Sequence, residues 1–260
     1  MKTIKSSIKK ILKYFNIKLL RDDYYQELVQ SDGASLDIKF LSGINSEFRS
    51  DCIDLLSISQ SQLRQDLFVL STLGFKRNGY FVEFGAAGGK SLSNTYLLEK
   101  NFDWVGILSE PAKIWHDQLR GCRSSSIDFR CVWSESGESV EFNEAYESEL
   151  STISSFSFND NHAKKRKNGN YYNVKTVSLL DLLTFHQAPS VIDYLSIDTE
   201  GSEFEILNAF DFDRFKFRVI TCEHNYTSSR EDIYNLLTSH GYKRVLENIS
   251  SFDDWYVLEI

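Results

Sequence analysis

The chain has 260 residues, of which 42% are hydrophobic and 25% charged, enough for one globular domain with a substantial core and an appendage. Its formal net charge of −8 argues against nucleic acid as a partner. The four cysteines form no C-x-x-C pair, so they indicate reduced thiols in a cytoplasmic protein rather than a disulfide framework or a zinc site.

Residues 1–21 differ from the rest of the chain because they contain seven basic side chains and no acidic one. Apolar residues recur at helical spacing from Ile4 to Leu19, which predicts a helix with one apolar and one cationic face. Such a helix could lie on an anionic membrane surface or dock on a partner, and an ordinary helix packed on the domain is the alternative. Lysines interrupt the apolar run, which argues against a cleaved signal peptide.

Residues 22–74 are expected to form a helical N-terminal extension that ends with a helix over residues 60–73. From residue 75 to residue 260, predicted strands and helices alternate. Strands are predicted at 80–84, 104–108, 127–133, 140–142, 171–177, 191–197, 217–222, 242–247 and 254–260. Helices are predicted at 91–100, 112–119, 178–185, 204–210 and 231–240.

This alternation predicts an α/β fold with a doubly wound, mostly parallel sheet covered by helices on both faces. The last two strands are joined by only about six residues, too few for a parallel crossover, so we expect an antiparallel hairpin. A doubly wound sheet with that ending is the Rossmann-like architecture of class I S-adenosylmethionine methyltransferases. A dehydrogenase sheet normally stays parallel.

A glycine-rich turn follows the first predicted strand, in the segment GYFVEFGAAGGKSL of residues 79–92. A phosphate loop needs four residues between its two glycines, and only three separate Gly85 from Gly89. The dinucleotide fingerprint is not met either, since Ala87 and Lys90 replace its second and third glycines. A methyl-donor turn needs only a close backbone approach, and the carboxylate of Glu83 suits the donor's cationic amino group. The turn therefore favours S-adenosylmethionine as the cofactor.

A second carboxylate, Glu110, ends the following strand and is expected to bind both ribose hydroxyls. Dehydrogenases place an acid similarly, so Glu110 alone does not discriminate between the two classes. Trp133 or Ser134, after the third strand, would border the adenine. The predicted cofactor-binding residues are Glu83, Gly85, Ala86, Ala87, Gly88, Ser91, Glu110, Pro111, Trp133 and Ser134.

Several segments together resemble the FkbM methyltransferases over roughly residues 68–257: FVEFGAAGGKSLSNTYLLEK, WVGILSEP, DYLSIDTEGSEFEIL, ITCEHNY and DDWYV. The I-D-x-E-G-x-E part is the most specific. The resemblance implies a S-adenosylmethionine-dependent O-methyltransferase, and many members act on sugars, glycolipids, surface polysaccharides or polyketides. One departure is visible, because related turns often carry an acidic residue or asparagine where this chain has Gly88 or Gly89.

Candidate catalytic residues follow the later strands, because ligands of open α/β sheets bind at the carboxyl ends of the strands. Methylation of a sugar hydroxyl needs a base or a metal to remove the proton. His224 is the expected base, and Asp198 and Glu200 could orient it or act as bases themselves. Asp198 and Glu223 could instead bind Mg²⁺ together with waters. The sequence does not decide whether a base or a metal ion activates the acceptor hydroxyl.

An irregular stretch from Glu144 to Asn170 interrupts the alternation and carries the basic run Lys164-Lys165-Arg166-Lys167. This run could meet a diphosphate on a nucleotide sugar or lipid carrier, or form a solvated loop. The expected protein is a cytoplasmic enzyme with a carbohydrate acceptor, peripheral at the inner membrane if residues 1–21 bind there. A non-catalytic Rossmann-like adaptor and a nicotinamide-dependent oxidoreductase are the alternatives, and the oligomeric state is open.

Overall fold

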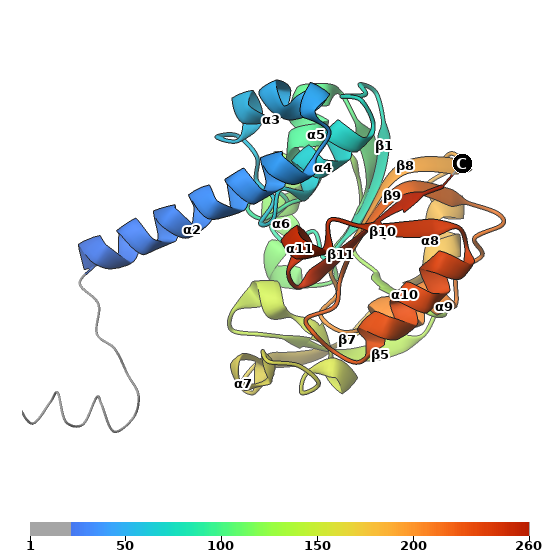
Figure 1. The fold of residues 1–260 in the computed structure, drawn as a ribbon. Coiled ribbons are helices and arrows are strands. Elements are labelled where there is room, and N and C mark those ends of the chain that lie inside the picture. The colour runs from blue at the N-terminus through green and yellow to red at the C-terminus, as the bar shows by residue number, and fades with distance from the viewer. Residues whose placement is uncertain (1–21, 260) are drawn as a thin grey trace, which may run out of the picture. The chain divides into compact units, whose positions relative to one another are not determined.

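The computed structural model describes residues 22–259, and Figure 1 shows their fold. Contacts divide the chain into two compact units, Met1–Lys39 and Phe40–Ile260. Most of helix α2 (Asp22–Gly43) belongs to the first unit. The amphipathic helix predicted for residues 1–21 lies outside the described residues, and the division predicted at residues 21 and 74 stays a prediction. Among residues 22–259, no helix has both the length and the apolar character needed to cross a bilayer.

A seven-stranded sheet forms the centre of the second unit, and its predicted type is confirmed. Strand β11 runs antiparallel to both of its neighbours, and the other pairs are parallel. The predicted terminal hairpin is therefore present as β10 and β11. In spatial order the strands are β10 (Tyr242–Val245), β11 (Asp253–Leu258), β9 (Lys216–Glu223), β8 (Val191–Ile197), β1 (Tyr80–Phe84), β2 (Val105–Ser109) and β3 (Ser126–Asp128).

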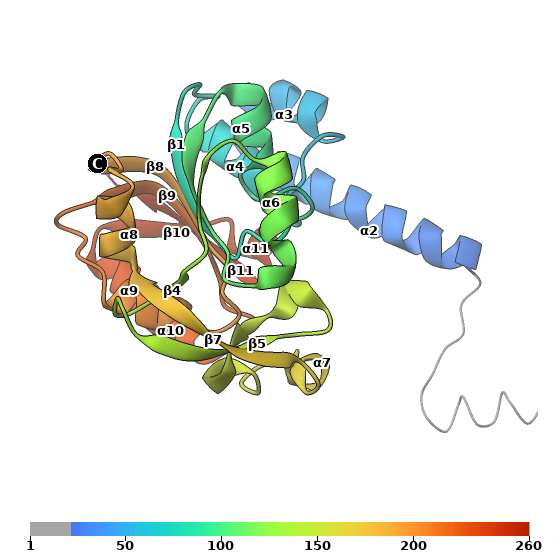
Figure 2. The ribbon, with the colours of Figure 1, turned by 180° about the vertical axis from the view of Figure 1, so that it is seen from behind.

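Helices cover both faces of this sheet (Figures 1 and 2). One face carries α4 (Gln65–Thr72), α5 (Tyr96–Phe102) and α6 (His116–Cys122). The other carries α8 (Leu179–Phe185), α9 (Glu203–Asn208) and α10 (Ser229–Ser239). Side chains of β1 pack against helices on both faces. Val82 and Phe84 belong to the core cluster that includes residues of α8, α9 and α10. On the other face, the guanidinium of Arg123, in the loop after α6, lies over the Phe81 ring. Shorter helical segments are α3 (Arg49–Leu55), α7 (Ala163–Arg166), α11 (Glu247–Ser250), η1 (Ser46–Phe48), η2 (Lys113–Trp115), η3 (Ser148–Leu150) and η4 (Ser154–Phe156).

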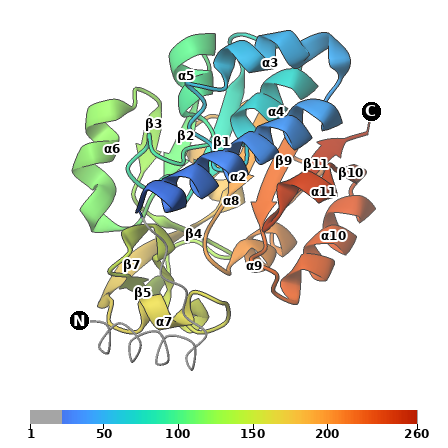
Figure 3. The same cartoon turned by 60° about the vertical axis from the view of Figure 1, so that its left-hand side comes forward.

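A second, four-stranded sheet is inserted between β3 and α8, which the sequence did not predict as a separate sheet. Its spatial order is β4 (Cys131–Trp133), β7 (Asn170–Ser178), β5 (Ser139–Glu144) and β6 (Thr152–Ile153). Figure 3 shows β5, β7 and α7 lying side by side. The predicted strand 127–133 is therefore wrong, because its two halves belong to different sheets. The Asp128 carboxylate accepts from the backbone N–H of Arg130 at 2.9 Å, and this local turn separates β3 from β4.

Two predicted helix starts are also wrong, and in each case a polar side chain shifts the start. The helix predicted at residue 91 begins at Tyr96, because the Ser93 hydroxyl accepts from the N–H groups of Thr95 and Tyr96. The helix predicted at residue 60 begins at Gln65, where the buried Asp66 carboxylate holds the preceding turn. The strand predicted to end at residue 247 ends at 245, because residues 247–250 form α11 within the hairpin connection.

Candidate active site

The turn after β1 brings backbone atoms against the ends of β2 and β8. The N–H groups of Gly85 and Ala86 donate to the carbonyl oxygen of Ser109, at 3.1 and 3.3 Å. Gly85 has a φ angle of +73°, and a Cβ atom there would lie 1.8 Å from the carbonyl oxygen of Asp198. Only glycine fits a position that combines this backbone angle with so close a contact. The turn thus joins the donor side of the sheet to the strand end that carries Asp198.

Glu110, which follows β2, closes the same turn from the other side. Its carboxylate accepts from the N–H of Ala87 and from the N–H of Ala112, both at 2.7 Å. The side chain is buried, and this burial raises the pKa of Glu110 to about 7. Each oxygen still has a free lone pair, so the carboxylate can accept hydrogen bonds from a diol.

A narrow cavity of about 40 Å³ lies beside the turn, at the carboxyl ends of the strands. The cavity is lined by main-sheet residues and by residues of the inserted segment, among them Ser148 and Ile153. Several residues predicted from the sequence line it, namely Gly85, Ala87, Glu110, Pro111 and Asp198. These residues come from three strand ends, as expected for a ligand site on an open parallel sheet.

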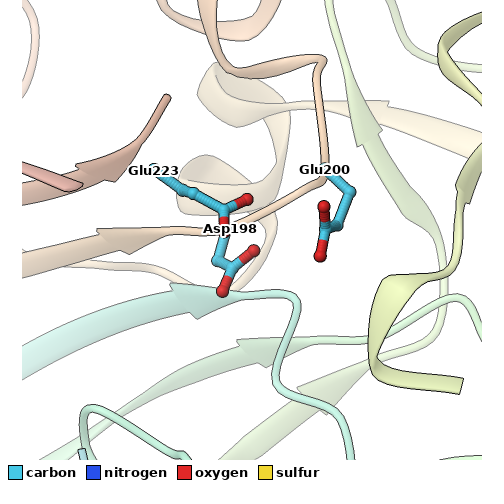
Figure 4. A group of neighbouring side chains, drawn as sticks. All are labelled: Asp198, Glu200 and Glu223. Atoms are coloured by element: carbon cyan, nitrogen blue, oxygen red, sulfur yellow. The ribbon is translucent and has the colours of Figure 1, made fainter. Parts of the chain in front are cut away.

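Three carboxyl groups meet where β8 and β9 end (Figure 4). Asp198 follows β8, Glu200 lies in the loop before α9, and Glu223 is the last residue of β9. One oxygen of each lies within 4.8 Å of the others. Figure 4 shows the Asp198 and Glu223 carboxyl groups next to each other, with Glu200 beside them. We call this set the carboxyl trio.

Burial and mutual repulsion keep the trio from being fully ionised. The Asp198 side chain is accessible at the cavity wall but closely surrounded by protein, and this desolvation raises the pKa of Asp198 to about 6. Burial, and then the charge of Asp198, raises the pKa of both Glu200 and Glu223 well above the usual range. Near neutral pH, an ionised Asp198 therefore stands next to a protonated Glu223. Such a pair can accept a proton on the Asp198 carboxylate and donate one from the Glu223 carboxyl group.

A larger polar hollow of about 380 Å³ opens on the other side of the trio. Glu200 and Glu223 line this hollow, whereas Asp198 lines the narrow cavity. Hydrogen-bonding side chains and one aromatic ring complete its wall: Asn159, Asn225, Thr227, Ser228, Ser229 and Phe156. The trio thus lies between a cavity beside the glycine turn and a polar hollow large enough for a second ligand.

The sequence profile of the methyltransferase FkbM domain matches residues 83–244, which is more than half of the chain. This chain belongs to the FkbM methyltransferase family. The match supports the predicted S-adenosylmethionine-dependent methyltransferase over the alternative of a nicotinamide-dependent oxidoreductase. No curated protein sequence matches the chain significantly.

Solved methyltransferase structures are similar to the chain at low sequence identity. The methyltransferase FkbM of Methylobacillus flagellatus KT has 12% identity and a TM-score of 0.47, covering 97% of this chain and 70% of its own. The precorrin-6y C5,15-methyltransferase of Geobacter metallireducens GS-15 has 15% identity and a TM-score of 0.37, with 69% and 71% covered. The human methyltransferase 10 domain containing protein has 12% identity and a TM-score of 0.36, with 78% and 85% covered.

Some residues that were predicted from the sequence to bind the cofactor lie away from the narrow cavity. Glu83 was expected to face the donor, but its carboxylate accepts from the Ser93 and Thr95 hydroxyls and from the Asn94 N–H. The alternation along β1 turns Glu83 toward α5, so it stabilises the turn from behind. Arg123 adds a buried charge partner, 3.5 Å from the Glu83 carboxylate.

The remaining predicted cofactor residues also differ from the expected placement. Gly88 packs under α6, since a Cβ there would lie 2.3 Å from the Gln118 amide nitrogen. Ala86 is buried and Ser91 is exposed, and neither lines the cavity. Trp133 and Ser134 do not line it either. Cys131 and Val132 of β4 take the lining position instead.

His224 lines the polar hollow, but its ring is already engaged. Its Nδ1 accepts from the Tyr226 N–H at 3.0 Å, and its Nε2 faces the Asp254 carboxylate at 3.7 Å. Burial lowers the pKa of His224, which keeps the ring neutral. Nε2 has no hydrogen-bond partner among the described residues. Because Nδ1 accepts a hydrogen bond, the neutral ring carries its proton on Nε2, so it has no free lone pair to take a proton from an acceptor. The structure therefore directs His224 toward Asp254 rather than toward the trio.

Arg166 is a site residue that the sequence reasoning missed. It is fully buried, and its guanidinium donates to Glu200, to both oxygens of Asp160 and to the carbonyl oxygen of Leu150. Asn225 donates to the same Glu200 oxygen at 3.1 Å. The basic run was the only local signal, but it did not distinguish Arg166 from its exposed neighbours Lys164 and Lys167. The sequence had suggested that the basic run could meet a diphosphate. Arg166 is not available for that role, because it is buried in its own contacts.

Proposed function

We propose that this FkbM methyltransferase is an O-methyltransferase that methylates a hydroxyl of a carbohydrate, carried on a nucleotide, a surface polysaccharide or a glycolipid. One observation carries the proposal. Asp198 lines the narrow cavity of the glycine turn, Glu200 and Glu223 line the polar hollow, and one oxygen of each lies within 4.8 Å of the others. The trio is therefore where an acceptor in the hollow and a donor beside the turn would meet. That junction is where an acceptor hydroxyl has to lose its proton.

The lining of the hollow suits a polyhydroxyl ligand. Amide and hydroxyl side chains such as Asn225 and Thr227 can donate and accept hydrogen bonds, and the Phe156 ring offers an apolar face to a sugar ring. An apolar acceptor would leave these groups without partners. The walls therefore support a carbohydrate better than a lipid tail or a flat aromatic acceptor.

The residues around the turn fit the methyl donor. Gly85 leaves room for a close backbone approach, and the buried Glu110 carboxylate can accept hydrogen bonds from a ribose diol. S-adenosylmethionine supplies a methyl group already activated on a sulfonium, so no further electrophile is required. The chain has only to hold the acceptor oxygen in line and remove its proton.

Asp198 is the proposed base. The acceptor oxygen forms the new bond to the methyl carbon, the carbon–sulfur bond breaks with its electron pair going to sulfur, and the hydroxyl proton passes to Asp198. A pKa of about 6 leaves Asp198 ionised near pH 7 while keeping it basic enough to accept a proton. The protonated Glu223 next to it stabilises the ionised form.

Mg²⁺ at the trio is the alternative route to an acidified hydroxyl. Asp198, Glu200 and Glu223 offer the oxygen ligands that this ion prefers, and the buried Glu223 Oε2 has no hydrogen-bond partner among the described residues. Bound there, the ion would act as a Lewis acid on the acceptor oxygen. Chelation separates the two routes, since turnover by a carboxylate base persists in excess chelator. Loss of turnover that Mg²⁺ alone restores would assign the role to the metal.

The test of the function is methyl transfer from labelled donor to a panel of nucleotide sugars and glycan fragments, by the wild type and by Asp198→Asn. We expect the variant to lose roughly 10²–10⁴ in kcat while it still binds S-adenosylhomocysteine, because a general base contributes about that factor. Asp213→Asn is the matched control, since Asp213 is an exposed carboxylate outside both cavities. Donor binding without transfer to any acceptor would favour the adaptor alternative.

A cytoplasmic location is part of the proposal. All four cysteines are free thiols, as is usual for proteins of reducing compartments. Fractionation of cells with an antibody to the chain, with periplasmic and cytoplasmic marker enzymes as controls, tests it.

A further inference from the structure

The polar hollow is lined by five carboxyl groups, and its lining contains no lysine or arginine among the described residues. Asp160, Glu200, Glu203, Glu205 and Glu223 all contribute to its wall. The only titratable nitrogen group in the lining is His224, whose Nε2 faces the Asp254 carboxylate at 3.7 Å. The lining of the hollow therefore offers carboxyl groups but no cationic side chain to an acceptor.

Internal partners neutralise or satisfy three of these groups. Arg166, from behind the wall, forms ion pairs with Asp160 and Glu200. The Glu203 carboxylate accepts from the N–H groups of Thr199 and Gly201, which satisfies it within the loop before α9.

Two carboxyl groups remain without such partners. Within residues 22–259, no hydrogen bond or ion pair reaches the half-buried Glu205 carboxylate. The Glu223 side chain is more than nine-tenths buried, and its Oε2 has no hydrogen-bond partner there. A buried polar oxygen without a partner is costly unless a ligand supplies the donor. Both groups line the same hollow. Glu205 points to a ligand with positive charge, and the Glu223 oxygen points to a ligand that brings a hydrogen-bonding group.

We propose that the hollow selects its acceptor by charge, binding a carbohydrate that carries an ammonium group and rejecting one that carries a carboxylate or phosphate there. This inference rests on the proposed function and narrows its substrate class. An ammonium group supplies three N–H donors and one positive charge, which matches free carboxyl oxygens. Glu205 is the specificity residue, because it adds charge to the wall without belonging to the trio.

The same charges argue against a diphosphate inside the hollow. A phosphate in the hollow would meet the unpaired Glu205 carboxylate and no cationic side chain in the lining, and like charges in a partly desolvated site repel. In the basic run, Arg166 is buried in its ion pairs and the Lys165 ammonium is paired with Glu147 at 2.6 Å. A nucleotide or lipid diphosphate therefore has to stay outside the hollow when the sugar is bound.

The experiment compares three acceptor probes of equal length: oligomers of glucosamine, of N-acetylglucosamine and of galacturonic acid. Binding to the full chain saturated with S-adenosylhomocysteine is measured by calorimetry in chelator, at a pH at which the glucosamine amines are protonated. We expect the glucosamine oligomer to bind roughly tenfold tighter than its acetylated counterpart, and the acidic oligomer to bind least. Equal binding of the acidic and the cationic oligomers would overturn the inference.

Two variants of equal charge change test the role of Glu205. Glu205→Gln should reduce the preference for the cationic oligomer at least roughly threefold, whereas Asp213→Asn, on an exposed loop, should leave it unchanged. Equal effects of the two would mean that only the net charge of the protein matters. Mg²⁺ is titrated alone as a separate arm, and binding of Mg²⁺ that is lost in Glu205→Gln without any glucosamine preference would also overturn the proposal.

These outcomes are separable from failure of the proposed function. Binding selectivity is read at equilibrium, without turnover. A chain that binds the cationic oligomer but methylates no carbohydrate would refute the function and leave the charge selection standing. Methylation of neutral and acidic sugars at equal efficiency would support the function and refute the charge selection.

Discussion

The carbonyl oxygen of Asp198 occupies the space next to Gly85, only 1.8 Å from where a Cβ atom at position 85 would lie. This contact ties the donor turn to the strand end that carries the proposed base. It fixes the distance between the two halves of the site without any side chain from the turn. The turn and the trio therefore form one unit, and disturbing either should affect both.

Gly85→Ala should destabilise the protein by about 3 kcal/mol or more, because the methyl group collides with backbone and the residue keeps a positive φ angle. The free energy of unfolding in urea measures this. Gly121→Ala is the control, since a Cβ atom at Gly121 meets nothing within 4 Å and the residue lies within helix α6. That substitution should be neutral or slightly stabilising. Equal stability of the two variants would contradict the contact.

Glu110 should make donor affinity depend on pH. Burial raises the pKa of Glu110 to about 7, and the ionised form accepts hydrogen bonds from a diol better than the protonated form. The Kd for S-adenosylhomocysteine should therefore rise as the pH falls below 7, by up to roughly tenfold per pH unit. Glu110→Gln should bind more weakly and with little pH dependence. Calorimetry across this range decides, and an unchanged pH profile in the variant would remove Glu110 from the donor site.

The same shift has an opposite consequence for folding. Between the unfolded pKa of Glu110, about 4.3, and the folded value of about 7, the native state keeps a proton that the unfolded chain releases. The contribution is therefore fully present below the unfolded pKa and is lost as the pH rises through 7. Wild-type stability should fall over this window, and Glu110→Gln should flatten part of the fall. Chemical unfolding curves at a series of pH values give the comparison.

Arg166 should contribute much more to stability than its neighbours in the basic run. Arg166→Met leaves the buried carboxyl groups of Asp160 and Glu200 without their cation, which typically costs about 3–5 kcal/mol. Lys165→Ala breaks an exposed pair with Glu147 and should cost at most about 1 kcal/mol. Arg166→Lys keeps the charge but cannot contact four acceptor atoms, so it should be intermediate. Similar losses for Arg166→Met and Lys165→Ala would show that the network is unimportant.

Residues 1–21 should confer membrane binding if the cationic and apolar faces read from the sequence act at a bilayer. Deletion of these residues should abolish sedimentation with anionic vesicles but preserve methylation of a soluble acceptor. Neutral vesicles are the control, because the attraction depends on anionic lipids. Sedimentation that survives the deletion would show that another surface is responsible.

Much of the framework could be predicted because continuous apolar runs bounded by turns mark buried parallel strands. The ranges predicted for β1 and β8 are those found, and the strand-end positions of Asp198 and Glu110 follow from them. The direction of Glu83 could not be predicted, because both faces of a parallel strand are buried and the pattern does not say which face meets the ligand. Arg166 and Glu200 are 34 residues apart, and no local pattern records such a pairing.

Side chains that bend the chain locally were also hard to anticipate. The turn formed by Asp128 and Arg130 sends two halves of one apolar run into different sheets, and in the second half Cys131 and Val132 line the cavity rather than Trp133 and Ser134. An Asx turn needs only a carboxylate and an N–H two residues later, so it leaves a weak trace in the sequence.

Because of the inserted sheet, the acceptor specificity of the site can change without a change in donor binding. The main sheet supplies the glycine turn and the carboxyl trio, whereas Phe156, Asn159 and Asp160 of the insertion form one side of the polar hollow. Because that segment leaves the main sheet after β3 and returns at β8, replacing it alters no central strand. The insertion also lines the narrow cavity, through residues from Ser148 to Ile153. A chimera that exchanges only residues 154–165 with those of a relative, keeping Arg166, should therefore retain the donor pocket while acquiring the relative's choice of acceptor.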